Sequence, residues 1–200
     1  MGSIVIDEKY DKCRKMLAES ISNKRYLHSI GVSNTAACLA MRYGFDSKRA
    51  YLAGLLHDCA KGLKNDELIA TVKKAGMDIS TTEYDNPELL HQKAGSVIAR
   101  EKYGIEDEEI LSAISYHTTG RPGMSLLEKI IFIADYIEPN REGLPELDKV
   151  RTVAFTDIDE SIMMVCASTL DHLKSGGMVI DDITLETYRY YSSIKDKKEN

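Results

Sequence analysis

Apolar residues recur along this chain at the spacing of helix faces, and sustained strand-like alternation is absent from the sequence. The stretch from about Lys24 to Tyr43 has one apolar face and stops at Gly44, a residue type that commonly ends helices. No Asn-Gly or Asp-Gly pair marks a hairpin turn. The pattern predicts an all-α fold, a single bundle of roughly eight to ten helices.

Seven further segments share this periodicity and have recognisable ends. They run from Asp46 or Ser47 to about Cys59, from Asn65 or Asp66 to about Ala75, from the Asn86-Pro87-Glu88 start through Ile98, from Asp107 to about His117, from Ser125 to Ile137, from Asp157 to Lys174, and from Ile183 to Ile194. We therefore expect one domain over residues 1–194, followed by a solvated tail, KDKKEN, at 195–200.

Length, charge and cysteine content narrow the class of protein. A chain of 200 residues buries roughly 70% of its unfolded surface, so a core forms without disulfides or a structural metal. Twenty-six basic against 32 acidic residues give a net charge of −6, which argues against a nucleic-acid polymer as partner. The four cysteines form no CxxC pair, and no apolar run reaches the roughly 18 residues of a membrane span. These features predict a cytoplasmic protein without a membrane partner.

Four of the five histidines fall on inward or stripe-edge positions of separate predicted helices. Asp58 follows one of them near a helix end, where a change of backbone direction can aim consecutive side chains at one point. Asp135 borders the core, and a buried carboxylate requires a cation or donors. A lone histidine, such as His172, is usually structural, but the joint pattern favours a metal site for iron, manganese or zinc. Its candidate ligands are His28, His57, Asp58, His91, His117 and Asp135.

Basic and hydroxyl residues close to these ligands in sequence suggest an anion site. A lone lysine or arginine is usually a solvated surface charge. However, Arg25 lies one helical turn before His28, and Lys61 follows Asp58 by three residues. Arg141 is a weaker candidate, because it could instead pair with Glu138. The loop after His117 adds hydroxyls, main-chain N–H groups and a guanidinium that could hold phosphates, from Thr118, Thr119, Gly120 and Arg121.

The order H…HD…H…H…D resembles the HD-domain metallophosphohydrolases. The stretches KRYLHSIGVSNTAACLA, AGLLHDCAKG, NPELLHQKAGSVIA and AISYHTTGRPGMSLLEKIIFIADYIEPNR further resemble the YqeK family, the HD-type symmetrical dinucleoside tetraphosphatases of bacteria. The resemblance extends from about Lys24 to Thr187, and HTTGR and ADYIEPNR are far more specific than HD alone. Cys59 departs from the pattern, since many members have a larger side chain there.

The resemblance implies an HD-domain bundle whose metal ligands are His28, His57, Asp58 and Asp135, with iron the leading metal and manganese or another transition metal the alternative. His91 and His117 would face the phosphates or hold a second metal bridged by Asp58, and the spacing leaves mononuclear and dinuclear centres open. Asp58 or Asp135 would orient the attacking water. His91 or His117 would protonate or neutralise the leaving phosphate.

The implied activity is symmetrical hydrolysis of diadenosine tetraphosphate, and of related dinucleoside tetraphosphates, to two nucleoside diphosphates. The sequence lacks a GYP tripeptide, and Lys61-Gly62 stands where alarmone hydrolases have an acidic pair. Three alternatives remain open: a nucleotidase acting on monophosphates, a non-catalytic nucleotide-binding regulator, and an oxygenase with a dinuclear iron site. The substrate in the leading interpretation is a small nucleotide, and the apolar stripes do not decide whether the chain forms a homodimer.

Overall fold

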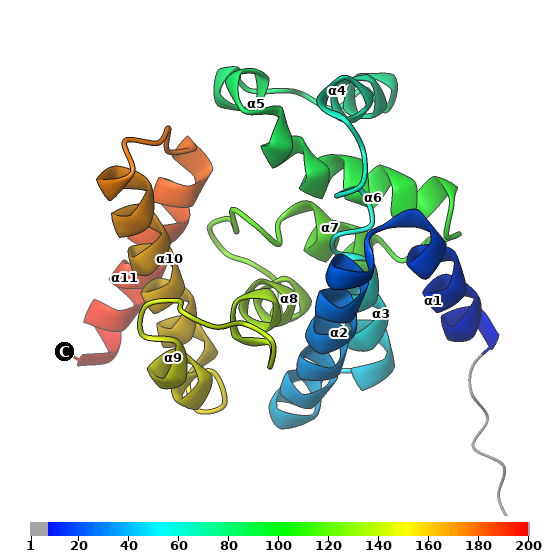
Figure 1. The fold of residues 1–200 in the computed structure, drawn as a ribbon. Coiled ribbons are helices and arrows are strands. Elements are labelled where there is room, and N and C mark those ends of the chain that lie inside the picture. The colour runs from blue at the N-terminus through cyan, green and yellow to red at the C-terminus, as the bar shows by residue number, and fades with distance from the viewer. Residues whose placement is uncertain (1–7, 200) are drawn as a thin grey trace, which may run out of the picture.

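The computed structural model describes residues 8–199, and the side chains of residues 8–195. All regular structure in this range is helical, which confirms the all-α prediction (Figure 1). The eleven α-helices within residues 8–199 exceed the expected count because the sequence patterns did not single out α1, α5 and α9. The elements are α1 Glu8–Ser20, α2 Asn23–Tyr43, α3 Ser47–Leu56, α4 Asn65–Lys74, α5 Thr81–Asp85, the 3₁₀ helix η1 Pro87–Leu90, α6 His91–Glu101, α7 Glu108–Ser115, α8 Leu126–Ile137, α9 Leu147–Val153, α10 Ile158–Ser175 and α11 Asp182–Glu199.

Helices α2, α3 and α8 form the centre of the bundle, with α1 on one side and the α10–α11 pair on the other (Figure 1). Glycine allows neighbouring helices to approach closely. A Cβ added to Gly54 would lie 2.9 Å from the Cα of Ser33 on α2, and one added to Gly95 would lie 3.2 Å from the Ile114 side chain. These close approaches bring the histidine-bearing helix ends together.

Several helix ends agree with the sequence-based expectation. Gly44 ends α2 in the left-handed conformation, with φ of +71°. The Asp46 side chain accepts hydrogen bonds from the N–H groups of Lys48 and Arg49, and Ser125 caps α8 through the N–H of Glu128. Local sequence signals therefore fix the end of α2 and the starts of α3 and α8.

Other boundaries differ from the expectation. Helix α3 ends at Leu56 rather than Cys59, because the chain then passes through a series of turns. Helix α4 begins at Asn65, as expected, but its N-cap position is held by Lys64 and not by Asn65 or Asp66, residue types that favour capping. The Asn86 side chain caps no helix: its amide donates to the Thr82 carbonyl, and η1 separates it from α6. Helix α7 ends at Ser115, so the expectation that His117 belongs to this helix was wrong.

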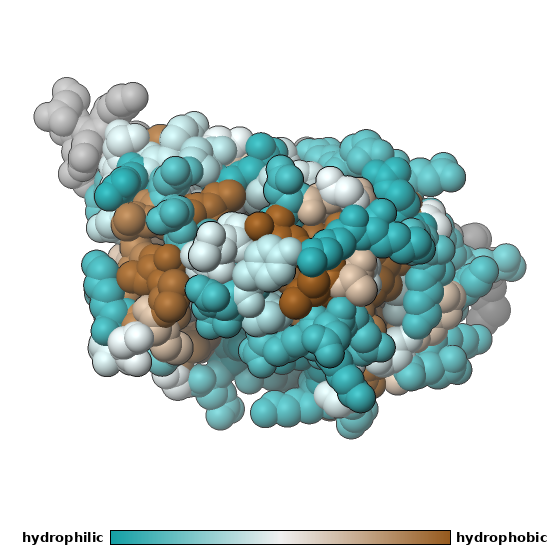
Figure 2. Space-filling view, turned by 90° about the horizontal axis from the view of Figure 1, so that it is seen from above, coloured by the Kyte–Doolittle hydropathy of each residue, from teal (hydrophilic) through white to brown (hydrophobic). Residues whose placement is uncertain are grey.

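The last helix begins at Asp182 and continues to Glu199, beyond the predicted end at Ile194. Of the predicted solvated tail at 195–200, Lys195 is half-buried and its Nζ lies 3.4 Å from Glu160 Oε1, while the side chains at 196–200 lie outside the described residues. Within residues 8–199, no helix combines the length and apolar character needed to cross a membrane. The face in Figure 2 shows apolar patches separated by hydrophilic side chains, so polar groups break up the apolar surface there.

Candidate metal centre

The six candidate metal ligands come together at one point of the bundle, although they belong to five separate segments. His28 lies on α2, and His57 and Asp58 follow the end of α3, where the turn aims both side chains inward. Asp135 lies on α8 and keeps 21% of its side chain exposed. The other members, His28, His57, Asp58, His91 and His117, are all buried. Three overlapping groups of these residues have ligand atoms within 4.8 Å of one another.

Asp58 lies between two pairs of histidines. Its Oδ2 is 3.4 Å from Nε2 of His57 and 3.9 Å from Nε2 of His28. Its Oδ1 is 3.4 Å from Nε2 of His117 and 3.5 Å from Nε2 of His91. The Asp58 carboxylate therefore faces one half of the cluster, which contains His28 and His57, through Oδ2 and the other half, which contains His91 and His117, through Oδ1. It could serve as a ligand shared by two cations.

Asp135 completes the first half of the cluster. Its Oδ1 lies 3.0 Å from Nε2 of His28 and 3.8 Å from Nε2 of His57. The half formed by His28, His57, Asp58 and Asp135 thus offers two imidazole nitrogens and two carboxylates. This mixed N/O donor set, without thiolates, suits a divalent transition metal.

The opposite nitrogen of each imidazole has a fixed partner. Nδ1 of His57 donates to the Gly54 carbonyl at 2.7 Å, and Nδ1 of His117 donates to the Ile114 carbonyl at 2.7 Å. Nδ1 of His91 lies 2.5 Å from the Glu88 carbonyl. Because a carbonyl only accepts, these rings carry their proton on Nδ1 and present the Nε2 lone pair to the cluster.

Buried polar atoms without hydrogen-bond partners test whether a metal fits. Nε2 of His28, Nε2 of His57 and Oδ1 of Asp58 are buried and have no such partner. All three atoms point into the same cluster, and burial of unpaired polar atoms is costly. A divalent cation would satisfy lone pairs that no donor of the described residues satisfies. The residues present therefore fit a metal centre.

Burial and neighbouring charges shift the pKa values of three cluster members. Burial alone would raise the pKa of Asp58, but the adjacent His57 and His117 outweigh it and hold that pKa well below its usual range. Burial would likewise raise the pKa of Asp135, and His28, His57 and Arg141 lower it. Burial, reinforced by His117, lowers the pKa of His91 to about 3. At neutral pH the carboxylates are charged and His91 is a neutral lone-pair donor.

Two arginines contact the carboxylates of the cluster. Arg25 Nη1 lies 2.6 Å from Asp58 Oδ2, as expected for a residue one turn before His28. Arg141 Nη2 lies 2.6 Å from Asp135 Oδ1, and its Nε donates to the Asp135 carbonyl. The side chain of Arg141 thus pairs with Asp135 rather than with Glu138. Both guanidinium groups orient acidic residues and add positive charge at the rim of the cluster.

The other candidate substrate residues occupy different positions around the centre. Lys61 is exposed, and its positive charge contributes to the lowered pKa of His91. The Thr118 hydroxyl lies 3.1 Å from Nε2 of His91, at the edge of the cluster. Thr119 is buried and, with the Thr118 main chain, hydrogen-bonds to Gln92, a residue that the sequence analysis missed. Gly120 has φ of +62° and packs against Thr187, so it turns the loop.

Arg121 differs from these residues, because its guanidinium donates to the buried carboxylate of Glu128 at 2.9 and 3.1 Å. Glu128 also accepts from the Ser112 hydroxyl and the Ser125 N–H. In the structure, Arg121 therefore ties the loop after His117 to α8. It is not among the residues that contact the cluster carboxylates.

A cavity of about 560 Å³ opens beside the cluster, between the start of α2 and the segment after α8. Its lining includes His28 and both arginines that contact the cluster, Arg25 and Arg141, together with Lys24, Asn140 and the exposed Leu27. The volume lies within the range of small-molecule sites. Cationic groups at the cluster end suit phosphates, while amide and apolar groups farther out suit an organic moiety.

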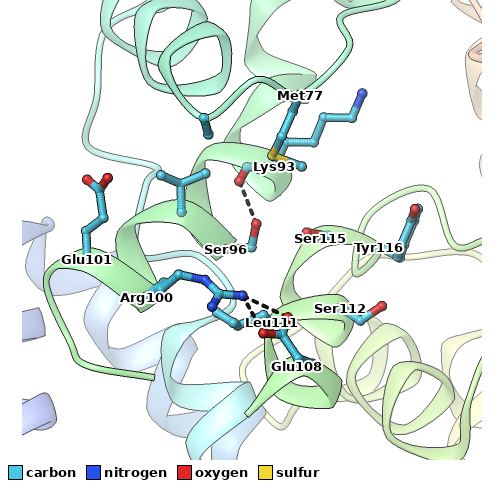
Figure 3. Close-up of a pocket in the computed structure, with 12 residues that line it drawn as sticks. Met77, Lys93, Ser96, Arg100, Glu101, Glu108, Leu111, Ser112, Ser115 and Tyr116 are labelled. Atoms are coloured by element: carbon cyan, nitrogen blue, oxygen red, sulfur yellow. Dashed lines mark hydrogen bonds and ion pairs between the residues drawn. The ribbon is translucent and has the colours of Figure 1, made fainter. Parts of the chain in front are cut away.

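A second cavity, of about 430 Å³, lies between α6, α7 and the segment after α4 (Figure 3). None of the predicted site residues lines it. Its charged groups are paired, Arg100 with Glu108 and Lys93 with Glu83. The first cavity, and not this one, is therefore the one joined to the candidate metal centre.

Comparisons with known proteins agree with the site. The family description "HD domain" matches residues 25–140. The symmetrical bis(5'-nucleosyl)-tetraphosphatase of Halalkalibacterium halodurans is 44% identical over 88% of this chain and 94% of its own, and that of Bacillus subtilis is 40% identical over 88% and 93%.

A solved structure with a similar fold comes from Clostridium acetobutylicum and is described as a predicted HD superfamily hydrolase involved in NAD metabolism. It has a TM-score of 0.89 and 42% identity, and the match covers 92% of this chain and 97% of that one. Matches of this extent, together with the H…HD…H…H…D cluster, establish the family. The chain belongs to the HD-domain family and, within it, to the YqeK family.

Proposed function

We propose that this chain hydrolyses diadenosine tetraphosphate and related dinucleoside tetraphosphates symmetrically, giving two nucleoside diphosphates. The observation that carries the proposal is Asp58, which lies between two histidine pairs and contacts Arg25, a residue that also lines the adjoining cavity. The two tetraphosphatases named above, which align with nearly all of this chain, provide independent support.

His28, His57, Asp58 and Asp135 would hold a divalent metal, with iron the leading candidate and manganese the alternative. Of the two roles open to His91 and His117, we favour that of ligands to a second metal ion, because their Nε2 lone pairs face Asp58 Oδ1. Metal at these ligands supplies a water activated for attack and a Lewis acid that offsets phosphoryl charge.

The protein's own groups would position the tetraphosphate. Arg25 and Arg141 are close enough to the cluster to neutralise phosphate charge while they orient Asp58 and Asp135. Lys61 and Thr118 lie on the His91 side, where they would contact the phosphates of the leaving half. Arg121 would reach substrate only by leaving Glu128. The site thus recognises one nucleoside diphosphate half at the cluster and contacts the other half less tightly.

The leading alternative within the family is a nucleotidase acting on monophosphates. Product identification on a panel of mononucleotides and dinucleoside polyphosphates separates the two activities. We expect nucleoside diphosphate as the product from dinucleoside tetraphosphates and little release of inorganic phosphate from monophosphates. Rapid release of inorganic phosphate from monophosphates, with dinucleoside tetraphosphates left intact, would contradict the proposal. If the metal-loaded protein bound these nucleotides but hydrolysed none of them, it would instead be a regulator.

We also propose that the protein works in the cytoplasm. All four cysteines are free, and Cys13, Cys59 and Cys166 are buried. Burial raises the pKa of the Cys59 thiol to about 12, so this cysteine stays a neutral thiol beside the metal centre. Reduced cysteines are typical of a reducing compartment. A fluorescent fusion in the native host that localised outside the cytoplasm would contradict this assignment.

A further inference from the structure

Glu138 is a buried carboxylate outside the predicted ligand set. It directly follows the end of α8 and is only 1% exposed. Its Oε1 lies 3.1 Å from Nδ1 of His28, the nitrogen that faces away from the cluster. His57, His91 and His117 bond main-chain carbonyls through the same nitrogen. His28 is therefore the only one of the four clustered histidines whose Nδ1 faces a carboxylate.

The second carboxylate oxygen fixes the segment after α8. Oε2 accepts from the N–H of Asn140 at 2.8 Å and from the Asn140 side-chain amide at 3.0 Å. Asn140 also lines the cavity beside the cluster. The buried Glu138 carboxylate thus contacts a candidate metal ligand, His28, through Oε1 and a residue of the cavity wall, Asn140, through Oε2.

Two neighbours hold Glu138 in this position. A Cβ built on Gly31 of α2 would overlap Glu138 Oε2, so only glycine leaves room for the carboxylate at this helix crossing. On the other side, Arg151 of α9 donates to the carbonyls of Ile137, Glu138 and Arg141 at 3.1 Å each. The main chain and the carboxylate of Glu138 are therefore both fixed.

We propose that Glu138 is a positioning residue: it holds the proton on Nδ1 of His28, fixes the ring plane and aims Nε2 at the metal. A carboxylate behind a ligand histidine also raises its basicity as a ligand, and loss of such partners typically costs about 10- to 100-fold in metal affinity. The inference rests on the proposed metal site, but it does not depend on which substrate is cleaved.

The test is the affinity of the chelator-stripped full chain for Mn²⁺, measured by calorimetric titration. Glu138→Gln keeps the size of the side chain and removes its charge, so we expect the dissociation constant to rise about 10- to 100-fold. Gly31→Ala leaves the carboxylate present but forces it aside, so it should weaken Mn²⁺ binding in the same direction. Because both changes act on one contact, Gly31→Ala should have less effect in a Glu138→Ala background.

Glu83→Gln is the matched control, since Glu83 is 4% exposed and pairs with Lys93 outside the cluster. It should leave Mn²⁺ affinity unchanged. If Glu138→Gln does not fold, Gly31→Ala decides the matter. Folded Glu138→Gln and Gly31→Ala proteins with wild-type Mn²⁺ affinity, whatever their melting temperature, would overturn the inference. A wild-type protein that binds Mn²⁺ but leaves tetraphosphates intact would contradict only the proposed substrate.

Discussion

Nε2 of His91 lies 3.1 Å from Nε2 of His117, although Nδ1 of each ring already faces a main-chain carbonyl. Two lone pairs therefore face each other in a buried place, with the Asp58 carboxylate beside them. A cation there would convert mutual repulsion into shared coordination. This relationship, more than the number of ligands, favours a metal centre over a hydrogen-bond network.

Metal should consequently stabilise the fold. Stripping with a chelator should lower the melting temperature, and adding Mn²⁺ should restore it. Binding at one hundred times the dissociation constant contributes about 2.7 kcal/mol to the free energy of unfolding. Calorimetric scans with and without Mn²⁺ measure the shift. An identical melting temperature in both states would mean that the cluster binds no divalent ion.

His57→Ala should remove metal and turnover together, because the ring contributes one of the buried unpaired nitrogens. Metal analysis of the purified protein and a hydrolysis assay give the two readouts. His172→Ala is the control, since His172 lies exposed on α10, and it should keep both. Full metal occupancy and normal activity in His57→Ala would rule out this ligand assignment.

Lys61→Ala should weaken phosphate binding without weakening the fold, because Lys61 is exposed near His91. The expected loss in kcat/KM corresponds to about 1.5–3 kcal/mol, the usual size of a hydrogen bond to a charged group. The melting temperature should stay close to that of the wild type. Lys48→Ala, an exposed lysine at the other end of α3, should leave kcat/KM unchanged. Equal kinetics for the two variants would make Lys61 a surface charge only.

Gly54→Ala should disturb the metal centre from a distance. The added methyl group would meet the Ser33 main chain at 2.9 Å, so α2 and α3 would have to separate, and His57 follows directly on α3. Overpacking of this kind typically costs about 1–3 kcal/mol of stability. We expect a lower melting temperature and lower Mn²⁺ affinity. Unchanged Mn²⁺ affinity would show that the ligand positions tolerate a shift of these helices.

The sequence predicted the elements that depend on local signals. Gly44, Asp46 and Ser125 have the capping roles that their residue types favour. The clustering of the histidines was also predictable, because each lies at a fixed offset from small or apolar residues that pack inward. The family resemblance then indicated which of the six candidates hold the first metal and which face the phosphates or a second metal, a division that spacing alone left open.

Local sequence patterns could not predict which residues distant in sequence contact each other. His28 and Glu138 are 110 residues apart, and nothing in either segment alone pairs them. An acidic residue between a buried helix and a proline was the only signal that could have pointed to Glu138. Arg121 is a second case: its place four residues after His117 suggests phosphate binding, whereas in the structure its guanidinium pairs with Glu128, a partner that no local pattern indicates. A charged side chain's partner depends on the tertiary fold.

Symmetrical cleavage at the cluster divides each tetraphosphate molecule into two nucleoside diphosphates. The most direct measurement is hydrolysis of diadenosine tetraphosphate in oxygen-18-labelled water, with the products resolved by mass spectrometry. Attack on a phosphoryl group held at Asp58 and expulsion of the other half should give one labelled and one unlabelled ADP per molecule cleaved. ATP with AMP as the products, or free inorganic phosphate, would contradict symmetrical cleavage.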